Sequence, residues 1–342
     1  MLRKALLAAA ASERIRELVT VTPATRTVVD RYVAGESIEE AVTVARTLRS
    51  AGLLVTLDYL GEETGDAQRA AATAAQYAHL LGKLAAEGLT DDGAVEVSVK
   101  PTALGLLLSS PGGATPRTPR GMSDGKARIS DMHASDGAAG PDILGERVAT
   151  EHLERIAIAA RDAGTTVTVD AEDHRTTDAT LRMATALRER FGSVGSVVQA
   201  ALRRTENDVR GMAAPGVRIR LCKGAYAEPP AEAFAARHDV DRSFARCLRI
   251  LMTGPGYPMI ATHDPRLIAI TRSLGLGRSP ASFEHQMLYG VRPEEQRRLA
   301  AAGAQVRVYV PYGNDWYRYL VRRLAERPAN LALFLRSLGS GS

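Results

Sequence analysis

Residues 166–200 read TVTVDAEDHRTTDATLRMATALRERFGSVGSVVQA, and in this segment two short β-branched runs flank a helical stretch. The runs occupy residues 166–170 and 196–200, and residues 177–190 between them are long enough for a crossover helix. A strand, a helix and a second strand in this order are typical of two parallel strands of one sheet. The segment therefore predicts an α/β fold built from β–α–β units.

The same alternation extends along the chain on both sides of this segment. The predicted strands are residues 53–60, 95–100, 166–170, 196–200, 217–221, 259–262, 281–287 and 306–310. The predicted helices are residues 64–86, 149–163, 177–190, 241–252, 266–274 and 293–302. Eight strands in about 300 residues favour a closed (βα)8 TIM-like barrel over an open doubly wound sheet. In such a barrel the chemistry collects where the strands run into the loops that follow them.

Two segments depart from this alternation. Residues 1–45 are rich in Ala, Arg and Glu with helical spacing, which predicts an N-terminal helical arm ahead of a barrel over residues 46–342. Charged residues follow the first apolar run at once, so we interpret that run as part of an amphipathic helix rather than as a signal peptide. Residues 109–142 hold 15 Gly, Pro or Ser among 34 residues. This insert is either disordered, which we favour, or a lid over the site.

The composition excludes several classes of protein. Of the 342 residues, 45% are hydrophobic and 24% are charged, which excludes a chain that is disordered as a whole. The 44 basic and 39 acidic residues give a net charge of +5, but the cations are spread along the chain, so we expect no nucleic-acid partner. No apolar stretch has the length of a transmembrane span. The two cysteines, Cys222 and Cys247, suit a reducing, cytoplasmic location.

The familiar nucleotide and metal motifs are missing from the sequence. Residues 275–280, GLGRSP, come closest to a G-x-G-x-x-G turn, yet they lack the third glycine and follow a predicted helix. There is no P-loop motif, and the seven histidines are scattered without the spacing of metal ligands. These observations argue against a Rossmann fold, a P-loop enzyme and a metal site.

Polar and ionisable side chains stand at the ends of several predicted strands. They are Lys100, Asp170, Gln199, Arg220, Lys223, Thr262, His263 and Asp264. Any one of them is explained as well by a solvated strand end or by a helix N-cap. Because five of the eight predicted strands share the pattern, we expect these side chains to meet at the mouth of the barrel and to form a site there.

A second pattern lies near the carboxyl end of the chain. On a helix, Tyr319, Arg322, Arg323 and Glu326 stand at positions i, i+3, i+4 and i+7 and form one polar stripe. Such a stripe is either a solvated face with Arg–Glu pairs or an adjacent guanidinium pair that grips a small carboxylate. The residue pattern alone leaves both interpretations open.

Seven motifs in the chain resemble, in order, those of flavin-dependent proline dehydrogenases. They are VSVK (97–100), VDAE (169–172), VQA (198–200), RLCKGAY (220–226), ATHD (261–264), YVP (309–311) and YLVRRLAE (319–326). The resemblance covers roughly residues 50–335 and is specific because several independent motifs occur in one order. The segment EHQMLYG (284–290) matches only loosely, and the Gly/Pro/Ser-rich insert is not part of the family pattern.

The resemblance implies a monofunctional enzyme that oxidises L-proline to Δ1-pyrroline-5-carboxylate and passes hydride to bound FAD. It also implies a quinone or similar electron acceptor, and it leaves open both functional coupling to a separate pyrroline-5-carboxylate dehydrogenase and peripheral attachment of a cytoplasmic protein at the inner face of the membrane. The last helix would lie across the barrel mouth. Oxidation of another cyclic imino acid such as hydroxyproline, and a degenerate barrel that senses an amino acid or flavin, are the alternatives.

The resemblance also implies a role for individual residues. Asp170 and Arg220 would be catalytic, with Arg220 beside flavin N5. The substrate residues that it implies are Lys100, Tyr309, Tyr319, Arg322, Arg323 and Glu326, with the arginine pair on the proline carboxylate. The FAD residues that it implies are Asp170, Ala171, Gln199, Arg220, Lys223, Gly224, Ala225, Thr262, His263 and Glu284. No metal ligand is implied.

Overall fold

The structure is a computed structural model that describes residues 29–61, 63–109, 141–317 and 319–320. Most of the predicted N-terminal arm, nearly all of the predicted insert and the chain after residue 320 lie outside the described residues.

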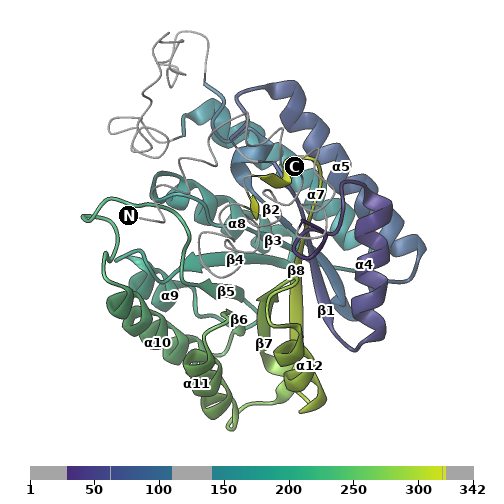
Figure 1. The fold of residues 1–342 in the computed structure, drawn as a ribbon. Coiled ribbons are helices and arrows are strands. Elements are labelled where there is room, and N and C mark those ends of the chain that lie inside the picture. Colours follow the sequence, from purple (N-terminus) through teal and green to yellow (C-terminus); the bar gives the residue numbers. More distant parts are fainter. Residues whose placement is uncertain (1–28, 62, 110–140, 318, 321–342) are drawn as a thin grey trace, which may run out of the picture.

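Eight parallel strands close into one barrel, in which each strand pairs with its neighbours in the sequence and β8 pairs with β1 (Figure 1). The strands are β1 (Leu54–Tyr59), β2 (Val95–Val99), β3 (Val167–Val169), β4 (Val194–Gln199), β5 (Arg218–Cys222), β6 (Tyr257–Ala261), β7 (Glu284–Leu288) and β8 (Val306–Tyr312). The predicted (βα)8 fold is confirmed, and all eight predicted strands are present with shifted ends.

Helices cover the outside of the barrel (Figure 1). They are α4 (Ile38–Ser50), α5 (Ala67–Ala86), α7 (Ile143–Asp162), α8 (Thr177–Phe191), α9 (Thr205–Met212), α10 (Arg237–Thr253), α11 (Pro265–Gly275) and α12 (Pro293–Ala301), with 3-10 turns η1 (Asp91–Gly93), η2 (Pro101–Leu104), η3 (His174–Thr176) and η4 (Pro280–Ser282). The prediction missed α9, whose buried residues are Thr205 and Val209. Two buried positions give too weak an apolar periodicity to recognise. Helix α7 starts earlier than predicted because Asp142 caps the Gly145 N–H at 3.0 Å.

Helix α4 belongs to the wall of the barrel rather than to a separate arm. Its buried side chains, among them Ala41 and Ala45, join the main hydrophobic core, and the helix lies against β1 and β8 (Figure 1). The chain ahead of α4 is attached to β8 as well, because the Ala34 N–H donates to the Pro311 carbonyl at 2.9 Å. The boundary predicted at residue 45 therefore falls inside a helix, and the packed part of the chain begins before it.

The strands divide their side chains between an apolar outer layer and a polar barrel axis. Outward-facing residues such as Val97 and Val99 join the hydrophobic core against the helices. The inward-facing polar side chains include Thr56, Asp58, Glu96, Ser98, Thr168, Asp170, Arg220, Gln286 and Arg307, and all of these are buried. Buried polar groups require partners, so hydrogen bonds and ion pairs fill much of the barrel axis.

A small apolar cluster lies at the carboxyl ends of the strands. Leu60 and Val291, from the loops that follow β1 and β7, pack there with Trp316 and Leu320. Residues 316–317 and 319–320 are the described part of the predicted last helix, whose remainder lies outside the described residues. This first part of the helix therefore stands at the mouth of the barrel.

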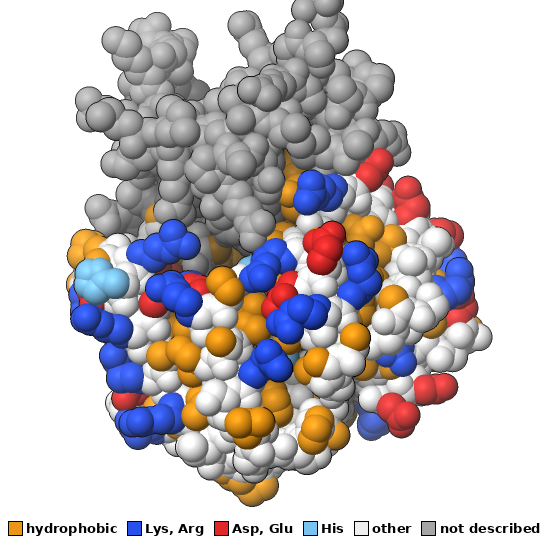
Figure 2. All heavy atoms as spheres, turned by 60° about the horizontal axis from the view of Figure 1, so that its bottom comes forward, with side chains coloured by type: hydrophobic (Ala, Val, Ile, Leu, Met, Phe, Trp, Pro, Cys, Tyr) orange, Lys and Arg blue, Asp and Glu red, His pale blue; other side chains and the backbone are white. Residues whose placement is uncertain are grey.

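Basic side chains are dispersed over the surface. Figure 2 shows Lys and Arg side chains spaced over one face of the molecule, with hydrophobic and neutral side chains between them. Several surface arginines pair with carboxylates, as Arg246 does with Glu206 at 2.7 Å and Arg298 with Glu295 at 2.6 Å. Exposed pairs of this kind contribute little to stability. In the part of the chain that the structure describes, no helix is long and apolar enough to cross a membrane.

Acid is expected to destabilise the fold through His285, which is buried on the outer side of β7. Burial, with help from Arg272, lowers the pKa of His285 to about 4, whereas an unfolded chain protonates histidine near its usual pKa of about 6.5. The stability is therefore intact above pH 6.5 and falls as the pH drops toward 4, by about 3 kcal/mol in total. Urea unfolding at pH 7 and pH 4.5 should show a smaller loss for His285→Leu than for the parent protein. If both proteins lose the same stability between pH 7 and pH 4.5, His285 does not cause the loss in acid.

Candidate active site

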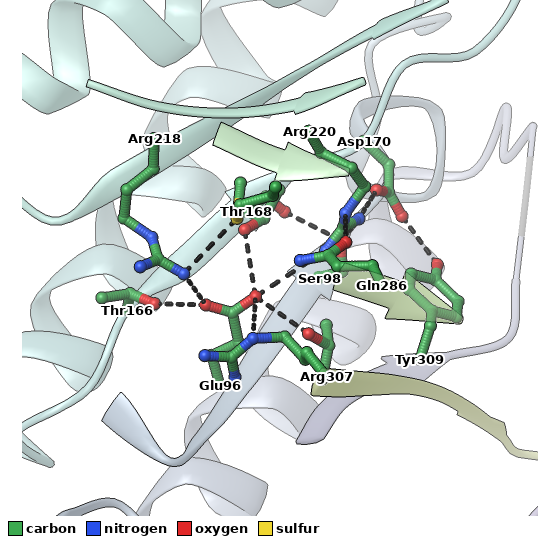
Figure 3. Close-up of polar contacts among 12 residues, drawn as sticks. Glu96, Ser98, Thr166, Thr168, Asp170, Arg218, Arg220, Gln286, Arg307 and Tyr309 are labelled. Atoms are coloured by element: carbon green, nitrogen blue, oxygen red, sulfur yellow. Dashed lines mark hydrogen bonds and ion pairs between the residues drawn. The ribbon is translucent and has the colours of Figure 1, made fainter. Parts of the chain in front are cut away.

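Arg220, in the middle of β5, is the centre of a buried polar cluster on the barrel axis (Figure 3). Its side chain is 5% exposed. The guanidinium donates from Nε to Gln286 Oε1 at 2.6 Å, and from Nη1 to Ser98 Oγ at 3.0 Å and Asp170 Oδ1 at 2.6 Å. Because two corners of its plane are anchored, the direction of the guanidinium is fixed. The fold thus brings together Asp170 and Arg220, the two residues expected to be catalytic.

Tyr309, on β8, contacts the other oxygen of Asp170 (Figure 3). Its hydroxyl donates to Asp170 Oδ2 at 2.7 Å, and its ring centre lies 5.2 Å from the guanidinium carbon of Arg220. Burial and the charge of Asp170 raise the pKa of Tyr309, so the hydroxyl stays protonated and can donate. Asp170 therefore fixes Arg220 and Tyr309 relative to each other.

Lys100, which follows β2, forms a buried ion pair with Asp58 of β1. The ammonium lies 2.7 and 2.6 Å from the two Asp58 oxygens, and the two side chains are 9% and 1% exposed. The carboxylate offsets the cost of keeping this ammonium charged away from water. Lys100 and Asp170 both stand just after the carboxyl ends of neighbouring strands, so a second fixed cation lies at the same end of the barrel as the Arg220 cluster.

Glu96, nearer the amino end of β2, forms a second buried centre on the barrel axis (Figure 3). Its carboxylate accepts hydrogen bonds from Thr166 at 2.6 Å and from Arg218 at 2.8 Å, and it lies 3.7 Å from Nη2 of Arg220. Burial alone would raise the pKa of Glu96, but Arg307, Arg218 and Arg220 outweigh burial and hold this pKa at about 2. A permanent negative charge therefore lies next to Arg220 on the side toward the amino ends of the strands.

Gln199 and Lys223 stand at the carboxyl ends of β4 and β5, where the resemblance places the cofactor. The Gln199 amide donates to the Glu172 carbonyl at 2.6 Å. The Lys223 ammonium lies 2.5 Å from Asp241 and 3.1 Å from Asp264. Two carboxylates thus already balance the charge of Lys223 within the protein.

Gly224 gives a direct indication of what this end of the barrel can hold. Its φ is +101°, and a Cβ there would lie 3.1 Å from Gln199 Oε1 and 3.2 Å from the Ala201 Cβ. Gly224 and Ala225 are exposed, whereas Gln199 is buried against them. The Gly224 backbone thus packs closely on Gln199, and because residues 224 and 225 carry little or no side chain, their exposed backbone stays accessible to a flat group rich in acceptors. The residues present therefore fit a flavin.

Three other residues expected at the cofactor lie at the same end of the barrel. Ala171 follows β3 and is partly buried, and Thr262 and His263 follow β6. The Thr262 hydroxyl accepts the Asp264 N–H at 3.1 Å, and His263 Nε2 accepts the Leu288 N–H at 2.9 Å. A neutral His263 therefore carries its proton on Nδ1.

Glu284 does not belong to this group, which corrects the expectation from the resemblance. It is the first residue of β7, so it stands at the amino end of the barrel, and it is fully buried. Its carboxylate accepts hydrogen bonds from Arg307 at 2.8 Å, Gln286 at 2.5 Å and Tyr257 at 3.0 Å. The Glu284 carboxylate is therefore hydrogen-bonded within the protein, and it lies away from the mouth where the other cofactor residues stand.

The residues predicted from the carboxy-terminal stripe are described only in part. Tyr319 is 6% exposed and packs in the apolar cluster with Leu60 and Trp316. Arg322, Arg323 and Glu326 lie outside the described residues.

Several residues of the polar cluster were missed by the sequence analysis. They are Asp58, Glu96, Ser98 and Gln286. Asp58 interrupts the apolar run of β1 near its carboxyl end, which is the signal that singled out Asp170. Glu96, Ser98 and Gln286 lie within their strands, where only the alternation of inward and outward positions distinguishes them from solvated residues.

A closed parallel barrel with a buried ionised cluster near the carboxyl ends of its strands defines an enzyme of the (βα)8-barrel class. A family model described as proline dehydrogenase matches residues 41–334. The chain belongs to the proline dehydrogenase family.

Curated relatives agree with this assignment over nearly their whole length. Proline dehydrogenase 1 of Bacillus subtilis (strain 168) is 36% identical over 310 residues, which cover 90% of this chain and 89% of the relative. The proline dehydrogenase of Deinococcus radiodurans is 32% identical over 345 residues, with 99% and 98% covered. Among solved structures, proline utilization A (PutA) from Bdellovibrio bacteriovorus, inactivated by N-propargylglycine, has a TM-score of 0.74 and 22% identity to this chain. That match covers 94% of this chain and 38% of the longer protein, and it shows the fold.

Proposed function

We propose that this protein oxidises L-proline to Δ1-pyrroline-5-carboxylate and that FAD is its cofactor. The observation that carries the proposal is the buried cluster of Tyr309, Asp170 and Arg220 in a barrel whose sequence belongs to the proline dehydrogenase family. Such a cluster presents a fixed cation and a fixed hydroxyl to a reaction at the barrel mouth. Preorganised groups of this kind stabilise charge that develops during a reaction.

The residues proposed to hold FAD are Asp170, Ala171, Gln199, Arg220, Lys223, Gly224, Ala225, Thr262 and His263. Bound FAD supplies an acceptor for the hydride that leaves the substrate carbon next to the ring nitrogen. Arg220 would stand beside flavin N5, the atom that receives the hydride, and help to stabilise the negative charge of the reduced flavin. The two anchored corners of its guanidinium keep it in one orientation, so this stabilisation costs no reorganisation during the reaction.

Arg322 and Arg323 are proposed to grip the proline carboxylate, with Glu326 holding the arginine pair in position. Lys100 would support the same carboxylate, and Asp58 keeps its ammonium charged for this role. A carboxylate held by several cations leaves the ring little freedom, so the carbon that gives up hydride is presented in one position.

Tyr309 and Tyr319 are proposed to pack on the pyrrolidine ring. The electrons would pass to a quinone or similar acceptor, and the product to a separate pyrroline-5-carboxylate dehydrogenase. The amine must be neutral when it releases hydride, because a positive charge on nitrogen opposes the loss of a negatively charged hydrogen from the neighbouring carbon.

The test is direct, since flavin is coloured. We expect a yellow protein whose flavin absorbance bleaches when L-proline is added without oxygen, and hydroxyproline and pipecolate serve as competing substrates under the same conditions. If hydroxyproline bleaches the flavin faster than proline does, hydroxyproline rather than proline is the substrate. A colourless protein that takes up no FAD would overturn the proposal.

Replacement of Arg322 or Arg323 by alanine is expected to weaken proline use about 10²-fold, because a charge-assisted pair with the substrate carboxylate is lost. The bound flavin should stay in place. Steady-state kinetics over a range of proline concentrations, together with the flavin content of each variant, measure both effects. Loss of flavin with normal proline kinetics after reconstitution would contradict the assigned role.

A further inference from the structure

Arg220 is held at its Nε corner by Gln286, a residue to which the resemblance assigns no role. Asp170 and Ser98 both bind Nη1, and Nη2 makes no hydrogen bond among the described residues. The Nε corner is held by Gln286 alone, whose Oε1 accepts at 2.6 Å (Figure 3). Anchoring Nη1 by itself would leave the guanidinium free to turn about that corner, so the bond to Gln286 is what fixes its plane.

The amide of Gln286 has only one orientation available. Its Nε2 donates to Glu284 Oε1 at 2.5 Å, and Gln286 itself is 3% exposed. Arg220 Nε can only donate and a carboxylate oxygen can only accept, so turning the amide over would break both bonds. Glu284 is held in turn by Arg307 at 2.8 Å and by Tyr257 at 3.0 Å. The hydrogen bonds at the amino end of the barrel thus fix Glu284, Glu284 fixes the amide of Gln286, and this amide orients the guanidinium of Arg220.

We propose that Gln286 is a positioning residue for the reaction, one that fixes the plane in which Arg220 donates toward the flavin. This inference rests on the proposed function for the role of Arg220, but the hydrogen bond from Arg220 Nε is a property of the protein alone. Gln286 lies on the side of Arg220 toward Glu284 and the amino ends of the strands, so it acts through Arg220.

Two substitutions at this position separate a positioning role from a packing role. Gln286→Met keeps the length and burial of the side chain but removes the amide oxygen that accepts from Arg220 Nε and leaves only a weak thioether acceptor. Gln286→Glu keeps an oxygen that accepts from Arg220. The new carboxyl group and that of Glu284 then lie in contact and share one proton, which forms a hydrogen bond between them. One shared proton also keeps the net charge of the pair unchanged. The second variant therefore retains the bond that the first one lacks.

Tyr257→Phe is a matched control for damage to the buried polar layer. It removes the bond to Glu284 Oε2 but leaves Glu284 Oε1 bound to Gln286 and Arg307. We expect this variant to lose stability without any change at Arg220.

The measurements are made on the flavin-loaded, full-length protein. For Gln286→Met we expect full flavin content, an altered visible spectrum, a lower flavin reduction potential in a dithionite titration, and flavin reduction by proline slowed about 10-fold, with proline affinity changed less than about twofold. Gln286→Glu and Tyr257→Phe should match the parent protein in potential and, within about threefold, in rate. An unchanged potential and spectrum in Gln286→Met, or equal losses in all three variants, would overturn the proposal.

A readout that needs neither flavin nor proline keeps this inference distinct from the proposed function. The Nε–H resonance of Arg220 in a 15N spectrum should be protected from exchange in the parent protein and in Gln286→Glu, and unprotected in Gln286→Met. If proline fails to bleach the flavin, the proposed function fails while this resonance still tests the bond. If the resonance is equally protected in both variants, the positioning role is wrong even in an active proline dehydrogenase.

Discussion

Replacement of Arg220 by lysine is expected to slow flavin reduction by proline about 10³-fold while the protein keeps its fold and its flavin. Lysine retains a positive charge among Asp170 and Glu96, so neither carboxylate is left without a cation. Its ammonium is a single point of charge and cannot reproduce a planar group anchored at two corners. The hydrogen bond to Gln286 Oε1 is therefore lost together with the direction of donation.

Stopped-flow mixing with proline in the absence of oxygen measures this step separately from reoxidation. Ser98→Ala is a suitable comparison, because it removes the longest of the three Arg220 hydrogen bonds, at 3.0 Å, and leaves both anchored corners in place. Its effect should be at least 10-fold smaller than that of Arg220→Lys. If the flavin of Arg220→Lys is reduced as fast as that of the parent protein, Arg220 has no role in flavin reduction.

Replacement of Asp58 by alanine is expected to lower the free energy of unfolding by about 3–5 kcal/mol, because it leaves the buried Lys100 ammonium without the carboxylate that neutralises it. The Tyr77 hydroxyl keeps its bond to the Ser98 carbonyl at 2.7 Å, so the loss comes from the charge rather than from general disorder of the site. Urea unfolding monitored by far-ultraviolet circular dichroism measures the change.

The double variant Asp58→Ala, Lys100→Met provides the control. Removing both charges leaves no buried ion to stabilise, so most of the lost stability should return, whereas proline binding should not. If the double variant is as unstable as Asp58→Ala alone, the penalty comes from the cavity at residue 58 and not from the ammonium.

The fold could be predicted because its signal repeats along the chain. Seven of the eight predicted strands have β-branched residues on the outer layer, and these positions pack against helices, as Val97 and Val99 do, whereas residues 281–287 contain none. Helix α9 was missed because its buried face has two residues. The boundary at residue 45 was misplaced because α4 has the same Ala- and Glu-rich composition as the residues before it, and only its packing on β1 and β8 distinguishes it.

The site could be predicted best where a polar residue stands at or near the end of a strand. Lys100 and Asp170 gave that signal, and both lie at the barrel mouth. Glu96 and Gln286 did not, because a polar residue inside a strand reads as solvated until the closed barrel shows that its inner face is buried. Glu284 was expected at the cofactor only from the resemblance, through the loosely matching segment 284–290, and the structure places it at the start of its strand instead.

The buried charges on the barrel axis also bear on how the chain reaches its native state. Glu96 lies on β2, but its guanidinium partners Arg218 and Arg307 lie on β5 and β8. An assembly of the first four strands contains neither of these arginines, and its open inner face leaves this carboxylate in water. Glu96 therefore becomes buried and paired only when β5 and β8 are in place. Closure of the barrel thus links the burial of a charge near the start of the chain to strands near its end.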